Sequence, residues 1–404
     1  MRPRTALRPA LTALLVGGLL ATAPTPAAAR KVDQVHPVPA SGKYVVKGHG
    51  FGHGIGMSQH GAQGAALAGL THEEILAFYY PGTELGAAGG KIRVLVSADT
   101  TPDVVVRARK GLFIRDLGAG TNAVLPDNGA AQWRIVPDAQ RRSTVQFLRD
   151  GVWRKWRAKG PGTLQGDGQF RAKGPLDLVT PLGVRRYRGA LRSASPAPGS
   201  ADRDTVNVLS LDNFVKGVVP REMPVSWQPE AVQSQAVAAR TYAVNDRLRN
   251  KQRHYHTCDT TSCQVYGGKA DEHPLGNAAV KATAGQIVTY EGSPAFTQFS
   301  SSSGGWSAKG STPYLRAHAD PYDDWSGNSN HDWSTTLTAV RIQQAYPAIG
   351  KLQRIRITGR EGYGEWQGRV TTMVLEGSKA KRTLTGPEFR FRFGLRSAWF
   401  TFGG

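Results

Sequence analysis

Residues 217–243 constrain this chain more than any other segment. Glu222 lies between Pro220 and Pro224, and the two proline rings stiffen the backbone on both sides of the carboxylate. A helix is predicted to begin at Pro229, because proline is tolerated in the first helical turn. A carboxylate held in a stiff loop beside the start of a helix suits acid or base catalysis. The segment therefore predicts a helical site region centred on Glu222.

The beginning of the chain is expected to be a secretory signal peptide covering residues 1–29. It has three early arginines, an apolar run over residues 10–23 and a small-residue cleavage site at Ala27–Ala29. The apolar run is too short to span a bilayer, and no other run reaches that length. We therefore expect a secreted protein without stable membrane insertion after cleavage. Residues 30–43 are polar, contain prolines and lack periodicity, so they are expected to be a linker.

Three further parts follow this linker. Residues 44–89 contain the glycine-rich run Gly48-His-Gly-Phe-Gly-His-Gly-Ile-Gly-Met-Ser-Gln and then a helix, which the capping box of Thr71 and Glu74 begins. Residues 90–205 consist of short alternating runs and turns, which predict a β-rich part. Residues 206–404 carry the longest helical pattern, followed by further strands. The expected fold is α+β, with a helical catalytic subregion packed on mixed, mostly antiparallel β-sheets.

The run Pro-Arg-Glu-Met-Pro, followed by Ala-Ala-Arg-Thr-Tyr, resembles the signature of the SpoIID/LytB family over about two dozen residues. SpoIID members of this family are lytic transglycosylases that act on peptidoglycan glycan strands, with the motif glutamate as acid/base. The resemblance implies that Glu222 is catalytic, that glycan strands are the partner and that no cofactor is needed. A hydrolase normally needs a second carboxylate, whereas a lytic transglycosylase uses the 6-hydroxyl of the sugar itself. Glu230 is a rival, but it lies in the first helical turn, where it suits the helix dipole.

The order of the motifs differs from the usual order in this family. There, the Gly-His-Gly-x-Gly-Met-Ser-Gln segment closes the domain, whereas here it comes first, and the chain stops just after Phe-Arg-Phe-Arg-Phe-Gly-Leu-Arg-Ser. The resemblance then covers nearly all of residues 44–404 in rotated order. We interpret this as a circular permutation, which requires termini that lie close together. Residues 44–89 are accordingly expected to pack against residues 385–404.

The resemblance also implies residues that bind the substrate. The Ser-Ser-Ser-Gly-Gly segment lines the cleft in this family, and the glycine- and histidine-rich segment packs beside it. The candidates are Ser301, Ser302, Ser303, His53, Ser58, Gln59, Arg240 and Tyr266. All of them have structural alternatives: an ion pair for Arg240, which borders the buried stripe of its helix, a core position for Tyr266, a plain loop for Ser301, Ser302 and Ser303, and a packing role for the segment with His53, Ser58 and Gln59.

The two cysteines, Cys258 and Cys263, leave two possibilities open on their own. A local disulfide is the default in an exported chain, while the nearby His254 and His256 also allow a zinc site. Some family members bind zinc with two cysteines and two histidines, and a histidine commonly precedes the second cysteine. This chain has Ser262 at that position, so we expect a disulfide and no metal.

The charge of the chain indicates anionic partners. The formal net charge is +21, and +18 without the three arginines of the signal peptide. Such an excess attracts anionic polymers. We expect anionic wall polymers and not nucleic acid, because no long basic block or nucleic-acid-binding motif is present. A generally basic proteome is the alternative, since arginine heavily outnumbers lysine.

Three functions are therefore compared. The first is a secreted lytic transglycosylase that leaves 1,6-anhydro-N-acetylmuramic acid ends. The second is a non-catalytic wall-binding enhancer of an amidase, as in LytB-type relatives. The third, a metalloenzyme built on the cysteines and histidines, ranks last.

Overall fold

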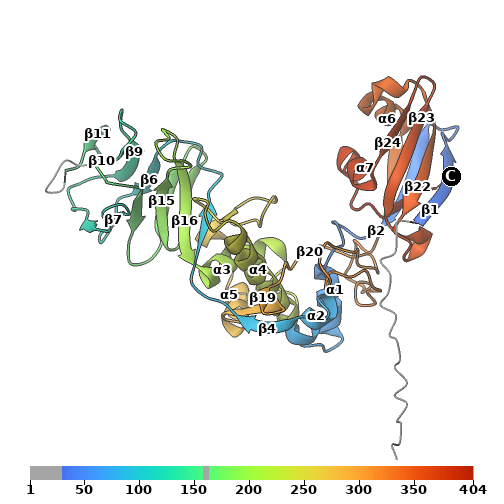
Figure 1. Cartoon of the computed structure of the whole chain (residues 1–404), viewed down its shortest axis with the longest axis horizontal. Coiled ribbons are helices and arrows are strands. Elements are labelled where there is room, and N and C mark those ends of the chain that lie inside the picture. Colours follow the sequence, from blue (N-terminus) through green and yellow to red (C-terminus); the bar gives the residue numbers. More distant parts are fainter. Residues whose placement is uncertain (1–29, 158–162, 404) are drawn as a thin grey trace, which may run out of the picture.

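The structure is a computed structural model that describes residues 30–157 and 163–403. The α+β fold predicted from sequence is confirmed, since the sheets are mostly antiparallel and the helices are largely segregated from them. Figure 1 shows a β-rich part at one end, a helical region in the middle and a second β lobe at the other end. The predicted signal peptide lies outside the described residues. Within the described part of the chain, no helix is long and apolar enough to cross a membrane.

The helical region is built around one long, buried helix. This helix, α4 (Pro229–Arg249), is rich in alanine, and its small side chains let neighbouring elements approach on all sides. Its neighbours are α1 (Gln59–Leu67), α2 (His72–Tyr79), α3 (Leu211–Glu222), α5 (Pro274–Ala282) and a sheet of β4 (Glu84–Ala87), β18 (Gln286–Tyr290) and β19 (Ser293–Pro294). The predicted capping box of Thr71 and Glu74 is confirmed at the start of α2.

The β-rich part consists of two sheets whose apolar faces pack on each other. One has the strand order β17-β5-β16-β15-β12-β7-β8, the other β11-β10-β9-β6-β13-β14. The first sheet contains β5 (Lys91–Leu95), β7 (Phe113–Asp116), β8 (Asn122–Val124), β12 (Gly168–Arg171), β15 (Ala190–Ala194), β16 (Asp204–Ser210) and β17 (Thr257–Cys258). The second contains β6 (Val104–Arg107), β9 (Gln132–Pro137), β10 (Ser143–Arg149), β11 (Val152–Lys155), β13 (Leu176–Thr180) and β14 (Gly183–Tyr187). Strand β16 leads directly into α3, so this part anchors the helix that carries Glu222.

The second β lobe combines strands from both ends of the described chain. Its sheets have the orders β1-β22-β23-β24 and β21-β2-β25. The elements are β1 (Arg30–Pro37), β2 (Lys43–His49), β21 (Asp332–Thr338), α6 (Ala339–Ala345), β22 (Leu352–Arg360), β23 (Val370–Gly377), β24 (Lys381–Leu384), α7 (Gly386–Phe393) and β25 (Phe400–Gly403). A separate hydrophobic core fills this lobe. A two-stranded parallel pair, β3 (Met57–Ser58) with β20 (Phe299–Ser300), lies between the lobe and the helical region (Figure 1).

This lobe corrects one expectation and confirms another. Residues 30–43 are not a linker over their whole length, because residues 30–37 form β1, which pairs with β22. The hydrogen bonds of an edge strand come from a partner more than 300 residues away, which local periodicity does not reveal. The predicted packing of residues 44–89 on residues 385–404 is confirmed, because β2 pairs antiparallel with β25. The permutation of the chain order itself stays a prediction.

Candidate active site

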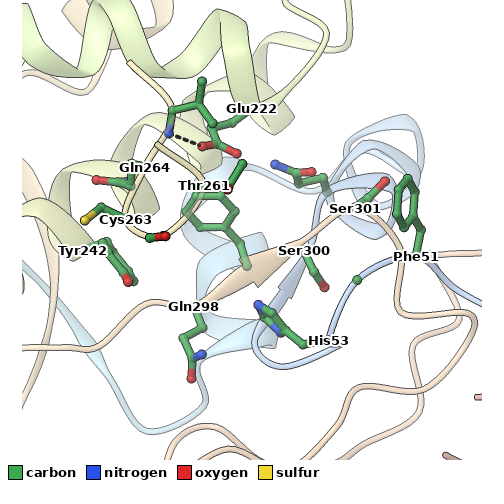
Figure 2. A pocket seen from close by; sticks show the side chains of 15 residues that line it. Phe51, His53, Glu222, Tyr242, Thr261, Cys263, Gln264, Gln298, Ser300 and Ser301 are labelled. Carbon is green, nitrogen blue, oxygen red and sulfur yellow. Dashed lines mark hydrogen bonds between the residues drawn. The ribbon is translucent and has the colours of Figure 1, made fainter. Parts of the chain in front are cut away.

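A cavity of about 550 Å³ opens between the helical region and β20, and Glu222 lies in its wall. Figure 2 shows Glu222 on one side of this space and Ser300, Ser301 and His53 on the opposite side, with Tyr242 of α4 further along the wall. The remaining lining residues are Phe51, Gly52, Gln59, Thr261, Ser262, Cys263, Gln264, Val265, Gln298 and Phe299. Four segments far apart in sequence therefore meet at one carboxylate.

The end of α3 positions Glu222. The sequence predicted a proline-braced loop at this point, but the helix continues through Pro220, and Glu222 is its last residue. Met223 is extended, with φ −138° and ψ 142°, which is the conformation that a following proline favours. Pro224 therefore sets the end of the helix. The carboxylate is held by a helix terminus and not by a loop, which corrects the expected local structure.

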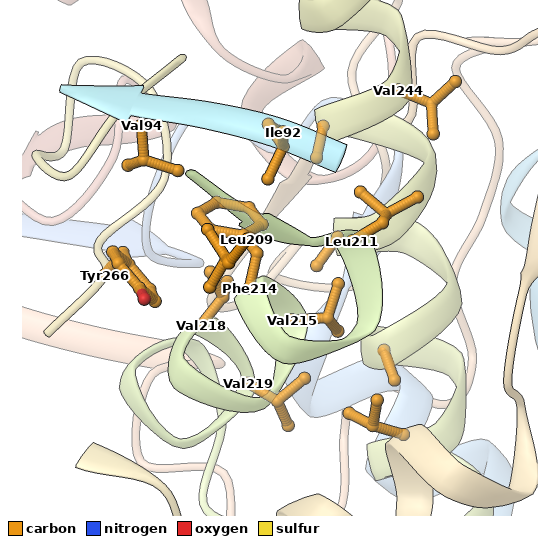
Figure 3. Packing of buried hydrophobic residues seen from close by; sticks show 14 of the residues in the cluster. Ile92, Val94, Leu209, Leu211, Phe214, Val215, Val218, Val219, Val244 and Tyr266 are labelled. Carbon is orange, nitrogen blue, oxygen red and sulfur yellow. The ribbon is translucent and has the colours of Figure 1, made fainter. Parts of the chain in front are cut away.

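The face of α3 that turns away from the cavity packs into the main hydrophobic core. Figure 3 shows Phe214, Val215, Val218 and Val219 of this helix among buried side chains of β5, β16 and α4. Gly217 lies directly against the Tyr266 ring: a Cβ at this position would come within 2.6 Å of a ring carbon. This close approach fixes how deeply the helix sits, and with it the position of Glu222.

We expect the substitution Gly217→Ala to destabilise the fold. Alanine gains about 1 kcal/mol of helix propensity over glycine, but the added methyl group would overlap Tyr266 and a backbone oxygen of Gly268. Overpacking of this kind costs about 1–3 kcal/mol, so the clash outweighs the gain. Denaturant unfolding measures the difference, and Lys216→Ala in the same helix is the matched control. A Gly217→Ala protein that is more stable than the wild type would contradict the packing argument.

The environment of Glu222 favours its protonated form. The pKa of its carboxyl group is raised above the ordinary value because burial disfavours the charged form, against a smaller lowering by a hydrogen bond from a backbone amide. That bond is donated by the N–H of Val265 to Oε1 at 3.2 Å, and it is the dashed line in Figure 2. A partly buried carboxyl group that keeps a proton is the form required of a general acid.

Glu230, the rival carboxylate, lies in a different environment. Burial alone would raise its pKa, but hydrogen bonds from His72 outweigh this effect and lower it. The backbone N–H of His72 donates to its Oε2 at 2.7 Å, and the His72 ring nitrogen Nδ1 lies 3.0 Å from the same oxygen. Glu230 thus ties α4 to α2 and does not line the cavity of Glu222. Its role is structural.

Three of the predicted substrate-binding residues line the cavity: His53, Gln59 and Ser301. Nδ1 of His53 accepts a hydrogen bond from the N–H of Ile55 at 2.9 Å, which leaves Nε2–H as a donor. The pKa of His53 falls to about 4, because the surrounding protein desolvates the ring and because the positive charges of Arg369 and Arg390 act on it. A backbone hydrogen bond at Phe299 acts in the opposite direction but is outweighed, so the ring is neutral near pH 7.

Glycines shape the segment that carries His53. Gly54 and Gly56 have φ values of +75° and +70°, in the left-handed region that favours glycine. A Cβ at Gly54 would come within 2.1 Å of the Arg369 guanidinium, and one at Gly56 within 2.1 Å of the carbonyl oxygen of Gln298. The glycines therefore allow close backbone packing, and this packing places His53 in the cavity wall.

Two predicted substrate contacts are corrected to structural roles. The side chain of Arg240 is fully buried, and its Nε donates to Oδ1 of Asp212 at 2.8 Å. Tyr266 is 3% exposed and donates its hydroxyl to Asn207 at 2.8 Å. Neither residue borders the cavity, because both side chains point into the core of the helical region. The alternatives weighed for them from sequence, an ion pair and a core tyrosine, are what the structure has.

Three of the predicted serines also turn away from the cavity. Ser58, Ser302 and Ser303 are each about 1% exposed. Ser58 caps α1 and donates to Oδ1 of Asp323 at 2.6 Å, Ser302 donates to Oδ2 of Asp323 at 2.8 Å, and Ser303 donates to Oδ2 of Asp320 at 2.7 Å. They hold the cleft wall together and are not among the residues that line the cavity.

The sequence analysis missed the two aspartates on which these serines depend. Asp323 also accepts hydrogen bonds from the backbone N–H groups of Ser303 and Gly304 and from Asn328, and His331 pairs with it at 3.0 Å. The pKa of Asp320 is raised to about 7 by burial and by the charge of Asp323. Neither aspartate stands in a recognisable motif, so only the folded arrangement reveals them. Tyr242 and Gln298 at the cavity were missed as well, although Tyr242 belongs to the Ala-Arg-Thr-Tyr run.

Cys258 and Cys263 are joined in a disulfide, the pairing expected from sequence. Val265, whose amide donates to Glu222, lies two residues after Cys263, so the disulfide restrains this contact. The bond also occupies both sulfur atoms that a zinc site would need. Nearby, His254 pairs with Asp204, and Nδ1 of His256 accepts a hydrogen bond from the backbone N–H of Arg93.

Comparisons with known proteins identify the family of this chain. The family model described as SpoIID, Stage II sporulation protein, matches residues 200–290, which contain α3, α4 and the disulfide loop. The protein is 30% identical over 284 residues to "Stage II sporulation protein D" of Bacillus subtilis (strain 168), an alignment that covers 64% of this chain and 72% of that relative. The chain belongs to the SpoIID/LytB family.

Two further relatives support this membership. "Stage II sporulation protein D" of Bacillus amyloliquefaciens is 30% identical over 248 residues, which cover 54% of this chain and 68% of the relative. The "Amidase enhancer" of Bacillus subtilis (strain 168) is 38% identical over 136 residues, which cover 32% of this chain and 17% of the relative. These matches make the chain a cell-wall-related SpoIID/LytB protein.

Proposed function

We propose that this protein is a lytic transglycosylase that cleaves peptidoglycan glycan strands, with Glu222 as acid and then base. The observation that carries the proposal is the composition of the cavity. Among the described residues that line it, Glu222 is the only carboxylate. Hydrolases normally place two carboxylates about the scissile bond. One carboxylate suits a reaction in which the sugar supplies its own nucleophile.

The reaction needs one proton carried in two directions. Protonated Glu222 donates its proton to the glycosidic oxygen, and the bond from that oxygen to C1 of N-acetylmuramic acid breaks. The resulting carboxylate then takes the proton from the 6-hydroxyl of the same sugar while the oxygen of that hydroxyl attacks C1. The products are a 1,6-anhydro-N-acetylmuramic acid end and a strand with a new 4-hydroxyl, and Glu222 is protonated again. No water is consumed, which suits a partly buried acid.

Mass spectrometry of the products tests this proposal. Intact peptidoglycan and strands stripped of stem peptides are each incubated with the protein. A product lighter than the reducing-end fragment by the mass of one water identifies the anhydro sugar. A reducing end would instead show hydrolysis and contradict the proposed reaction.

The relationship to an amidase enhancer favours a second candidate function. In that case the same cavity binds glycan strands without cleaving them, and the protein increases the activity of a separate amidase. Binding to both substrates with no new chain end on either would replace the enzymatic proposal with this one. We also propose that the protein is exported to the cell wall, in keeping with the signal peptide predicted from sequence.

We expect the cleavage rate to fall as pH rises through the raised pKa of Glu222. The acid form is the reactive one, so activity is present below this pKa and is lost above it, tenfold per pH unit at the limit. The raised pKa extends activity to higher pH than an ordinary glutamate would allow. A pH profile of kcat/KM reports the group in the free enzyme. Glu230→Gln is the control, and the fall of its kcat/KM at high pH should lie at the same pH as in the wild type. A shift of this fall in the control variant would show that Glu222 is not the group whose titration limits activity.

A further inference from the structure

A row of charged side chains crosses the outer face of the six-stranded sheet, outside the lining of the Glu222 cavity. Asp177 of β13 pairs in register with Arg186 of β14. On the other side, β13 pairs with β6 through Leu178 and Val106, so Arg107 stands beside Asp177 one position further along. Leu178 and Val106 are buried between the sheets. Because side chains alternate along a strand, the charged row faces outward.

This row borders a cavity of about 390 Å³. Its lining consists of Arg107, Ala108, Arg109, Lys110, Pro175, Asp177 and Arg186. Arg109 is held at one side because its guanidinium donates to the carbonyl oxygens of Lys173 and Pro175, the former at 2.9 Å. The cavity shares no residue with the cavity of Glu222. It is therefore a separate, strongly basic depression.

Few of these cations are neutralised. In the described part of the chain, the only ion pair in the lining joins Arg186 to Asp177, with Nε 2.6 Å from Oδ1. Arg107, Arg109 and Lys110 are exposed and have no such partner, so the site keeps three unpaired positive charges around one neutralised pair. The surrounding β-rich part has the same bias: residues 91–205 contain 21 lysines and arginines, 10 aspartates and no glutamate.

We propose that this cavity is a docking site for a phosphate-rich polyanion, such as a phosphodiester polymer of the cell wall. Cations reach it from β6, from the turn after β6 and from β14, so they approach a bound group from different directions. A tetrahedral phosphate presents oxygens in several directions and can satisfy them together, whereas a planar carboxylate presents two. Guanidinium groups bind phosphate oxygens in pairs. The excess charge of the whole β-rich part suits a polymer better than a single ion.

The test uses the whole protein and long-chain inorganic polyphosphate as the probe. Arg107→Gln combined with Lys110→Gln removes two exposed charges, and neither side chain makes an ion pair that the fold needs. We expect about tenfold weaker polyphosphate binding. Lys351→Gln combined with Arg382→Gln removes the same charge from the second β lobe and is the matched control, expected to bind within about twofold of the wild type. Arg107→Lys combined with Lys110→Arg keeps the charge and should restore most of the binding.

Several outcomes would overturn this proposal. Equal losses in the variant and the matched control would mean that net charge alone attracts the probe. Polyglutamate that binds as tightly as polyphosphate would remove the phosphate preference, and duplex DNA that binds more tightly would assign the site to nucleic acid. Thermal unfolding of each variant shows whether a loss reflects misfolding. The proposal does not use Glu222, so the binding result stands whether or not the protein cleaves glycan strands.

Discussion

Replacing Glu222 with glutamine is expected to lower glycan cleavage by about two orders of magnitude or more, in line with typical contributions of a general acid. The amide keeps the size of the side chain and can still accept the hydrogen bond from the N–H of Val265. It has no proton to donate to the glycosidic oxygen. Binding of glycan strands should therefore remain while the anhydro product disappears. Rates of product formation and pull-down with insoluble peptidoglycan measure the two effects separately.

Glu230→Gln is the control for this experiment. It removes the same charge from the same region but weakens only contacts outside the cavity, those of Glu230 with His72 and Gln233. We expect a small loss of stability and cleavage close to that of the wild type. If Glu222→Gln cleaves glycan as well as Glu230→Gln does, the assignment of the catalytic acid is wrong.

Asp323→Ala is expected to produce the largest loss of stability. The Asp323 side chain is fully buried and accepts hydrogen bonds from side chains and backbone amides of three separate segments. Removing it leaves those donors without a partner and leaves His331 without its counter-charge. Breaking a buried charged network of this kind costs about 3–5 kcal/mol. Denaturant unfolding should show this difference directly.

The neighbouring Asp324 offers a matched control, because it is exposed and carries the same charge. Asp324→Ala should change the free energy of unfolding by no more than about 0.5 kcal/mol. Similar values for the two variants would show that Asp323 does not hold the cleft wall together. The comparison also separates loss of the network from a general effect of removing one negative charge from a basic protein.

Local patterns predicted much of the helical region. The start of α4 at Pro229 and the capping box of α2 depend on residues close in sequence, and both are found as expected. The local structure at Glu222 was predicted wrongly, because a proline-braced loop was expected and the helix α3 instead continues through Pro220 to Glu222. A single backbone hydrogen bond is lost there, and the packed apolar face of the helix outweighs it.

The chemistry of the site was harder to predict, because it depends on partners distant in the chain. The buried stripe of α4 places Arg240 correctly at its border, but only the fold brings Asp212 to it. Ser301 and Ser302 are adjacent in sequence, yet one faces the cavity and the other faces Asp323. Residue type therefore indicated the right segments, while the direction of each side chain followed from packing that sequence alone does not show.

The second β lobe has a consequence for the order in which the protein folds. Ser397 donates a hydrogen bond to the carbonyl oxygen of His49, 348 positions away, and β2 lies between β21 and β25. Contacts of such separation form slowly, because a very long loop must close before they stabilise anything. As the chain is synthesised, residues 30–49 have no strand to pair with until β21 and β22 exist, and their last partner, β25, comes at the end of the described chain. The helical region has most of its core earlier, so we expect the lobe to close last and to be the part most dependent on chaperones.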